Sequence, residues 1–120
     1  MIILKGCEKM KVSELAKALD LKVITDKGFA DREIKSCYVG DLLSWVMGRA
    51  GQDSVWITIM SNVNIVAVAA LVDMACILLA EGVAIDEEVI KKADSQGIII
   101  LSTDKNSYEA AIAVHKAAAI

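Results

Sequence analysis

The chain has 120 residues, of which 56% are apolar and 24% charged, and its formal net charge is −3. This length is typical of one domain, and the apolar content excludes a disordered chain, because it supplies enough side chains for a core. Its 13 Lys and Arg residues are scattered and are outnumbered by 16 Asp and Glu, so no nucleic-acid partner is expected.

The first half of the chain shows the apolar spacings of short helices and strands. We predict a helix over residues 12–19, a strand over 21–25 closed by a turn at 26–28, a strand over 33–39 and a helix over 41–47. Asp41 is a candidate cap for the start of this last helix, and Gly48 and Gly51 are candidates to end it.

In the second half, strands and helices alternate. We predict strands over 54–60, 75–79 and 98–101, and helices over 63–73, 87–95 and 108–118. Ser61 and Asn62 favour a helix start, as does Asp86, whereas Gly97 should end a helix. Glu87 and Glu88 suit the first helical turn, because negative charge there complements the helix dipole.

This alternation predicts a single-domain α/β fold, with a parallel or mixed sheet and helices on both faces. The apolar run over residues 63–80 approaches the length of a membrane span, but Asn64 and Asp73 interrupt it. We therefore expect a buried helix followed by a buried strand, and no membrane association. The first five residues are too short for the apolar region of a signal peptide.

The cysteines and the histidine point to no redox or metal site. Cys7, Cys37 and Cys76 are odd in number and widely spaced, so they form neither a disulfide framework nor a zinc motif, and a reducing cytoplasm fits best. Cys76 lies in an apolar run and is expected to be a core residue. His115 is the only histidine, which excludes histidine clusters, and no cofactor is expected.

Two phosphate-binding motifs are missing from the sequence. Neither the GxxxxGK[ST] pattern of P-loop enzymes nor the GxGxxG pattern of dinucleotide-binding folds occurs. We therefore predict that the chain is not an enzyme.

The polar residues that remain follow the predicted strands at 54–60, 75–79 and 98–101. Loops at the carboxyl ends of parallel strands expose amides that can bind anions, although helix capping accounts for the same residue types. The candidate ligand-binding residues are Ser61, Asn62, Asn64, Gly82, Ser102, Thr103, Asp104 and Ser107.

The order of these segments resembles the DRTGG domain over roughly residues 12–114. The resemblance is carried by Tyr38-Val39-Gly40-Asp41-Leu42-Leu43-Ser44, Trp56-Ile57-Thr58-Ile59 with Ser61-Asn62, Ala75-Cys76-Ile77-Leu78-Leu79 and Ile98-Ile99-Ile100-Leu101-Ser102-Thr103. DRTGG domains resemble the amino-terminal domain of HPr kinase, accompany CBS domains in regulated pyrophosphatases, and occur in some phosphotransacetylases.

The resemblance implies an HPr kinase/Mur ligase amino-terminal-domain-like fold, in residues 12–120 after an extension over 1–11. It also implies a regulatory, homodimeric protein that senses an adenine nucleotide or another small anion, without HPr kinase activity, since the P-loop domain is missing. Two segments depart from the family. Ser61-Asn62-Val63 stands where many members carry Gly-Asp-Arg, and Ala80-Glu81-Gly82 where they carry Thr-Gly-Gly. Without that Arg, the chain lacks there the side chain that binds phosphate best, through two parallel hydrogen bonds.

Three functional hypotheses follow from the sequence. The first is a dimeric regulatory module that binds a small anionic ligand at the three strand-end loops. The second is an adaptor for a metabolic or redox enzyme, docking through an apolar face near Trp45 and Met47. The third and weakest is an enzyme built on Asp, Ser and Thr residues in an unfamiliar arrangement.

Overall fold

The structure is a computed structural model, and it describes residues 10–25 and 31–120. The predicted turn at 26–28, Cys7 and residues 1–9 of the predicted extension lie outside the described residues. The predicted order of elements is confirmed in the described part of the chain. The elements are α1 (Val12–Ala18), β1 (Lys22–Val23), β2 (Ser36–Val39), α2 (Leu43–Arg49), β3 (Ser54–Thr58), α3 (Asn64–Val72), β4 (Cys76–Leu79), α4 (Glu87–Gln96), β5 (Ile100–Ser102) and α5 (Ser107–Ala118).

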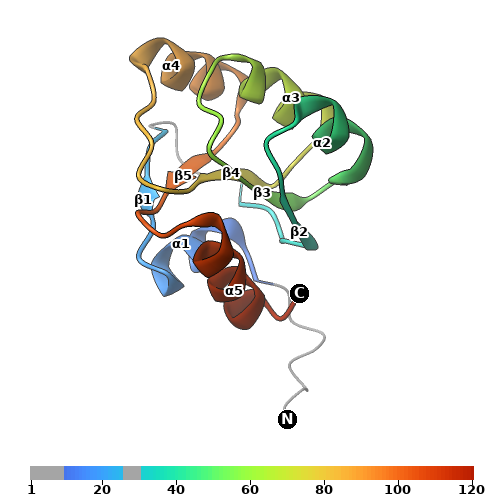
Figure 1. The fold of residues 1–120 in the computed structure, drawn as a ribbon, viewed down its shortest axis with the longest axis vertical. Helices are drawn as coiled ribbons and strands as arrows, with labels where there is room; N and C mark the ends of the chain where they lie inside the picture. The colour runs from blue at the N-terminus through green and yellow to red at the C-terminus, as the bar shows by residue number, and fades with distance from the viewer. Residues whose placement is uncertain (1–9, 26–30) are drawn as a thin grey trace.

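The strands form one five-stranded mixed sheet in the order β1-β5-β4-β3-β2 (Figure 1). β2, β3, β4 and β5 are parallel to one another, and the edge strand β1 pairs antiparallel with β5. All residues of β3 and β4 are buried, which is typical of parallel strands covered on both faces. The predicted α/β class is confirmed, and the sheet is of the mixed kind.

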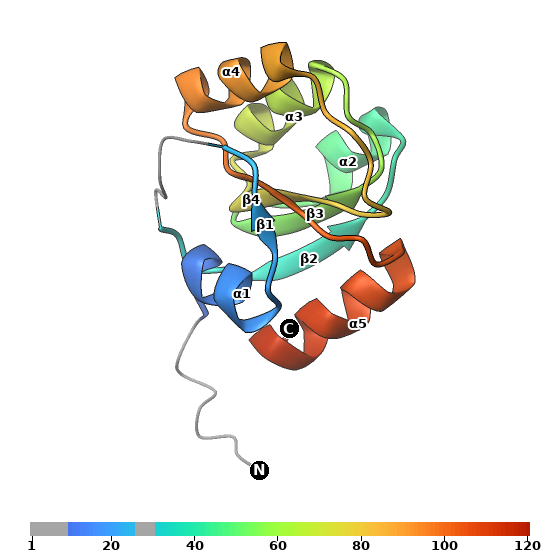
Figure 2. The same cartoon turned by 90° about the vertical axis from the view of Figure 1, so that its left-hand side faces the viewer.

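Helices cover both faces of the sheet. α1 and α5 lie on one face, and α2, α3 and α4 lie on the other (Figures 1 and 2). Because side chains alternate along a strand, Val55 and Ile57 pack with α1 and α5, whereas Trp56 between them packs with α2 and α3. The sheet therefore separates two apolar cores.

Helix ends follow the predicted residues in most places. Asp73 and Gly97 end α3 and α4 in the left-handed conformation, and Glu87 and Glu88 lie in the first turn of α4. Asp86 occupies the position before that helix, but its side chain makes no capping hydrogen bond. The predicted buried helix and strand over 63–80 are α3 and β4, and no helix of the described residues is long and apolar enough to cross a membrane.

The start and the end of α2 differ from the prediction. The helix begins at Leu43, and the Asp41 carboxylate accepts hydrogen bonds from Thr58 Oγ1 at 2.7 Å and Ile59 N at 3.0 Å. Asp41 therefore links the chain after β2 to the end of β3 instead of capping α2, because Thr58 and Ile59 donate hydrogen bonds to its carboxylate. Gly48 lies inside α2, and only Gly51, with a φ of +84°, follows the helix end.

An ionic cluster joins the amino ends of β3 and β4 to the chain that leads into β2. Arg32 Nη1 donates to Asp73 Oδ1 at 2.8 Å and to the Met74 carbonyl at 3.0 Å, and its Nη2 donates to the Asp53 carboxylate and the Asp73 carbonyl. The hydrogen bond from Arg32 holds the pKa of Asp73 below its usual value. This cluster stabilises the end of the sheet at which the parallel strands begin. The candidate site lies at the opposite end, where these strands finish.

Candidate functional site

The loops after β4 and β5 form one structural unit. Glu81 N donates to the Lys105 carbonyl at 2.8 Å, Gly82 N donates to the Thr103 carbonyl at 2.9 Å, and Thr103 N donates to the Leu79 carbonyl at 2.9 Å. These bonds extend the pairing of two parallel strands beyond their carboxyl ends. Residues from both loops are therefore held at fixed positions relative to each other.

Strand β1 adds a lysine to this edge of the sheet. Because β1 runs antiparallel, its first residue, Lys22, lies opposite Ser102, the last residue of β5. Ile24 N continues the pairing by donating to the Ile100 carbonyl at 2.9 Å. Sequence analysis missed Lys22, because an exposed lysine in a short alternating strand carries no signal of its position in the sheet.

A groove of about 500 Å³ opens beside Lys22, and we call it the apolar groove. Six of its ten lining residues are aliphatic, although polar and apolar atoms contribute equally to its exposed wall. Its lining residues are Lys22, Val23, Ile24, Gly82, Val83, Ala84, Ile85, Ile90, Ser102 and Asp104. Its volume lies within the range of small-molecule sites, about 300 to 1,000 Å³.

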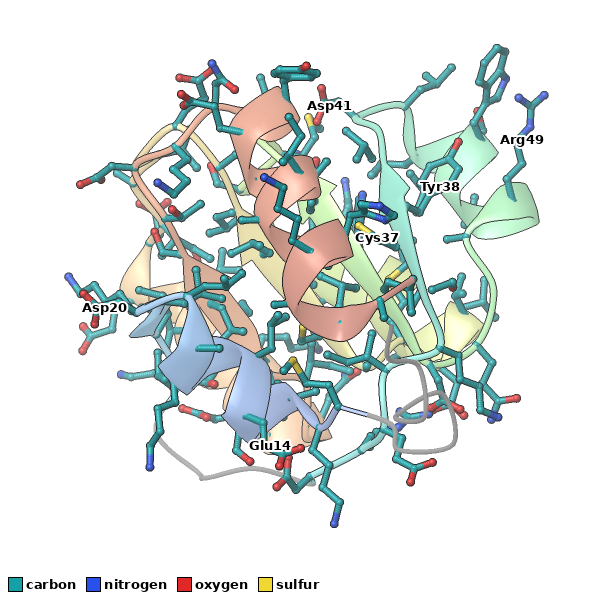
Figure 3. All side chains as sticks on the ribbon, turned by 90° about the horizontal axis from the view of Figure 1, so that it is seen from below. Glu14, Asp20, Cys37, Tyr38, Asp41 and Arg49 are labelled. Atoms are coloured by element: carbon teal, nitrogen blue, oxygen red, sulfur yellow. The ribbon has the colours of Figure 1, made fainter. Side chains whose placement is uncertain are left out.

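A second groove of about 420 Å³ adjoins the first, and we call it the lysine groove. It is lined by Leu19, Asp20, Lys22, Ser102, Thr103, Asp104 and Lys105. Lys22, Ser102 and Asp104 line both grooves. Figure 3 shows Asp20 on the opposite side of the molecule from Arg49, so this site lies far from helix α2.

The backbone of the loop after β4 favours glycine at two successive positions. Glu81 and Gly82 both have left-handed φ angles, +64° and +61°, a conformation that glycine adopts without steric cost. Glu81 occupies the first of these positions and Gly82 the second. A Cβ atom on Gly82 would lie 2.8 Å from Asp104 Oδ1, so the missing side chain makes room for that carboxylate.

Only part of the predicted ligand-binding set comes together. Gly82, Ser102, Thr103 and Asp104 line the grooves, whereas the four other predicted residues line neither of them. Those four are Ser61, Asn62, Asn64 and Ser107.

A local hydrogen bond accounts for Asn62 and Asn64, and Ser107 occupies a helix start. Asn62 Oδ1 accepts from Asn64 N at 2.9 Å at the start of α3. Ser107 is the first residue of α5, which is capped by Asn106, whose Oδ1 accepts from Glu109 N at 2.8 Å. The loop after β3 is separated from the grooves by β4, the central strand of the sheet.

The charges around the two grooves are balanced. Lys22 and Lys105 are the cations among the lining residues, and Asp20 and Asp104 are the carboxylates. Such a site can hold a ligand that carries both an anionic group and hydrogen-bond donors. Within residues 10–25 and 31–120, no group of three or more His, Cys, Asp or Glu side chains is placed to hold a metal ion.

The described cysteines are not activated. Burial raises the pKa of Cys37 to about 11 and, together with the neighbouring Cys37, that of Cys76 to about 12. Both thiols are free, and Cys76 is buried in the core, as predicted. A thiol with so high a pKa is protonated near neutral pH and is a poor nucleophile.

Comparisons with known proteins agree with the fold. The family model of the DRTGG domain matches residues 14–117. A similar solved structure is that of the CBS and DRTGG domains of the regulatory region of Clostridium perfringens pyrophosphatase, complexed with its activator diadenosine tetraphosphate. The two chains are 13% identical and superpose with a TM-score of 0.72, which covers 89% of this chain and 46% of that one. A comparison with curated proteins gives no match.

Proposed function

The chain belongs to the DRTGG domain family, and from this membership we propose that it is a non-catalytic regulatory module that binds a small anionic ligand in the apolar and lysine grooves. In the similar pyrophosphatase, the DRTGG domain belongs to a regulatory region that is complexed with a nucleotide activator. This chain spans 46% of that region, so the pyrophosphatase's own ligand site is not carried over to it.

The observation that supports the proposal most is the position of Lys22 and Lys105. Each lysine lies at the carboxyl edge of the sheet, next to a groove large enough for a small molecule. Ligands of open α/β sheets bind outside the carboxyl ends of the strands. The lysines also supply positive charge in a chain that has Val63 after β3, where many members of the DRTGG family carry Arg.

A thermal-shift screen of nucleotides and other anionic metabolites tests the proposal. A compound that binds only the folded state at about 100 times its Kd stabilises that state by about 2.7 kcal/mol. We expect at least one compound to raise Tm in the wild type and less so in Lys22→Gln. Lys91→Gln serves as the control, because Lys91 is exposed on α4 and lines neither groove.

The proposal is overturned if no compound raises Tm at saturating concentration, or if Lys22→Gln responds like the control. Its non-catalytic part is tested separately with a hydrolase and phosphotransfer screen. Turnover that Asp104→Ala abolishes would show an enzyme instead.

The free cysteines of the described chain support our further proposal that the module works in the reducing cytoplasm.

An exposed apolar surface supports a second candidate function, a homodimer or an adaptor for a partner enzyme. Leu42, Trp45 and Met47 are 57%, 52% and 44% exposed on and beside α2, and Arg49 stacks over the Trp45 ring at 3.8 Å. Aromatic, Met and Arg side chains are enriched in interface cores. Light scattering that shows a dimer, and a monomer for Trp45→Glu, would support the homodimer. A wild-type monomer with no partner in pull-downs would exclude both forms.

A further inference from the structure

Helix α2 carries the exposed apolar surface that supports the second candidate function, and its other residues indicate what kind of partner covers that surface. Building on that function, we propose that the outer face of α2 binds an amphipathic helix of another protein, which packs an apolar row of side chains over Ser44 and Gly48 and places a carboxylate on Arg49. The lining of the apolar and lysine grooves includes no residue of α2, so the two sites can be tested separately.

α2 is the outermost helix of its layer, beyond α4 and α3 (Figure 1). It packs into the core that it shares with α3 through Val46 and Ala50, which are 0% and 6% exposed. The large apolar residues Leu42, Trp45 and Met47 lie exposed on and beside the rest of the helix. A surface helix normally presents polar residues to water, so this apolar surface is typical of a protein-binding site.

Small and large side chains are arranged on the outer face of α2 in a pattern that suits another helix. Successive residues of an α-helix are turned by about 100°, so Ser44 and Gly48, one turn apart, lie opposite the buried Val46. Trp45 and Met47 lie on the two sides of them. The two smallest residues of the helix thus form a line between two large apolar ones, and a ridge of side chains from a second helix can pack along such a line.

Nothing in the described chain explains why residue 48 is a glycine. Gly48 lies in the interior of α2, where glycine destabilises a helix because it loses more conformational freedom on folding than alanine does. Its φ lies outside the left-handed range, and an added Cβ atom would meet no other atom within 4 Å. Close approach of a partner helix at this residue would explain the glycine, because a side chain there would hold the partner away.

Arg49 favours a partner that carries negative charge. Its guanidinium stacks over the Trp45 ring at 3.8 Å, and it forms no ion pair with a carboxylate of the described chain. The nearest carboxylate in the sequence, that of Asp41, is bonded to Thr58 and Ile59 at the end of β3. Figure 3 shows Asp41 well apart from Arg49. The planar guanidinium is therefore oriented and available for a carboxylate from outside the chain.

The same charge argues against a second copy of this chain as the partner. In a symmetric pair, the same surface of each copy meets the other. Two α2 helices packed face to face would bring two Arg49 side chains together with no carboxylate on either face, and like charges repel each other. A helix with Asp or Glu beside its apolar row instead pairs with Arg49 while that row packs between Trp45 and Met47. The adaptor form of the second candidate function is therefore favoured over the homodimer.

A display library of amphipathic helical peptides, selected against the full chain, tests this inference. We expect the selected peptides to carry Asp or Glu beside an apolar row, and their affinity, measured by fluorescence anisotropy, to fall about tenfold or more in Gly48→Leu. The same substitution should raise Tm by about 2–5 °C, because leucine favours a helix more than glycine does. Arg49→Gln should lower the affinity about two- to fivefold. Tyr108→Ala is the control and should change nothing, because it removes an exposed aromatic side chain from α5 on the other face of the sheet.

The outcomes separate this inference from the second candidate function. The inference is wrong if no peptide binds the wild type more tightly than Gly48→Leu, if the selected peptides lack Asp and Glu beside their apolar row, or if Gly48→Leu lowers Tm. The adaptor function still stands in these cases if pull-downs recover a partner that Trp45→Glu loses. If light scattering shows a dimer that Gly48→Leu dissociates, the inference is wrong and the homodimer stands. If no peptide, dimer or recovered partner depends on Trp45, both are wrong.

Discussion

The left-handed pair Glu81 and Gly82 leads to two substitutions with opposite effects on stability. Glu81→Gly removes a side chain from a residue with a φ of +64°, and Gly82→Ala adds one at a φ of +61°. A non-glycine residue in this conformation costs about 1–2 kcal/mol. Glycine loses about 0.4–1 kcal/mol more on folding, because its unfolded chain is more flexible. The difference is about 1 kcal/mol, stabilising for Glu81→Gly and destabilising for Gly82→Ala.

Urea unfolding followed by circular dichroism measures both changes. A difference of 1 kcal/mol also shifts Tm by about 2–6 °C in a domain of this size. Gly97→Ala is the matched control, because Gly97 has a φ of +71° and no atom within 4 Å of an added Cβ, whereas an added Cβ on Gly82 meets Asp104 Oδ1 at 2.8 Å. If Gly82→Ala lowers the free energy of unfolding by more than Gly97→Ala does, the additional loss measures the cost of displacing the Asp104 carboxylate.

Two results would refute this reasoning. If Glu81→Gly lowers the free energy of unfolding, the side chain of Glu81 makes a stabilising interaction that outweighs its backbone conformation. If Gly82→Ala is as stable as the wild type while Gly97→Ala is not, the loop after β4 does not have the conformation described. Either result would also remove the argument that Gly82 makes room for the Asp104 carboxylate.

Other parts of the molecule give three further predictions. Arg32→Met should lower the free energy of unfolding, because it removes the ion pairs of Arg32 with Asp53 and Asp73. Because the pKa of Asp73 is lowered in the fold, wild-type stability should fall as pH drops below about 4, and Arg32→Met should flatten this dependence in urea titrations. Asp41→Ala should cost about 1–2 kcal/mol in the same assay, because two hydrogen bonds are lost. In a Cys7→Ser variant, Cys37 and Cys76 should resist alkylation at pH 8 until urea unfolds the chain, because their thiols stay protonated; rapid labelling would contradict their burial.

The fold could be predicted from the sequence because its signals are local. β-branched runs such as 54–59 mark the central strands, and Gly97 and Asp73 mark helix ends through backbone conformation. The start of α2 could not be predicted from such signals. Asp41 is a good capping residue, but Thr58 and Ile59 reach its carboxylate from the neighbouring strand, and a single sequence does not show which strands are neighbours.

Only part of the candidate site could be predicted, because a single sequence shows where strands end but not which strands are neighbours. Ser102, Thr103 and Asp104 follow a strand that is easy to recognise, so their place at the carboxyl edge could be expected. Which loops adjoin depends on strand order. β5 lies between β4 and β1, which brings Lys22 to the site and leaves Asn62 on the far side of β4.

The central claim is that a ligand binds where the loops after β4 and β5 meet β1. Amide chemical shifts in a nitrogen–proton NMR titration with an anionic compound that raises Tm in the thermal-shift screen test it most directly. We predict saturable shifts confined to residues 19–24, 82–90 and 102–105, and none at residues 61–64. Shifts centred on residues 61–64, or no shifts when a ligand found by thermal screening is added at saturation, would contradict the site described.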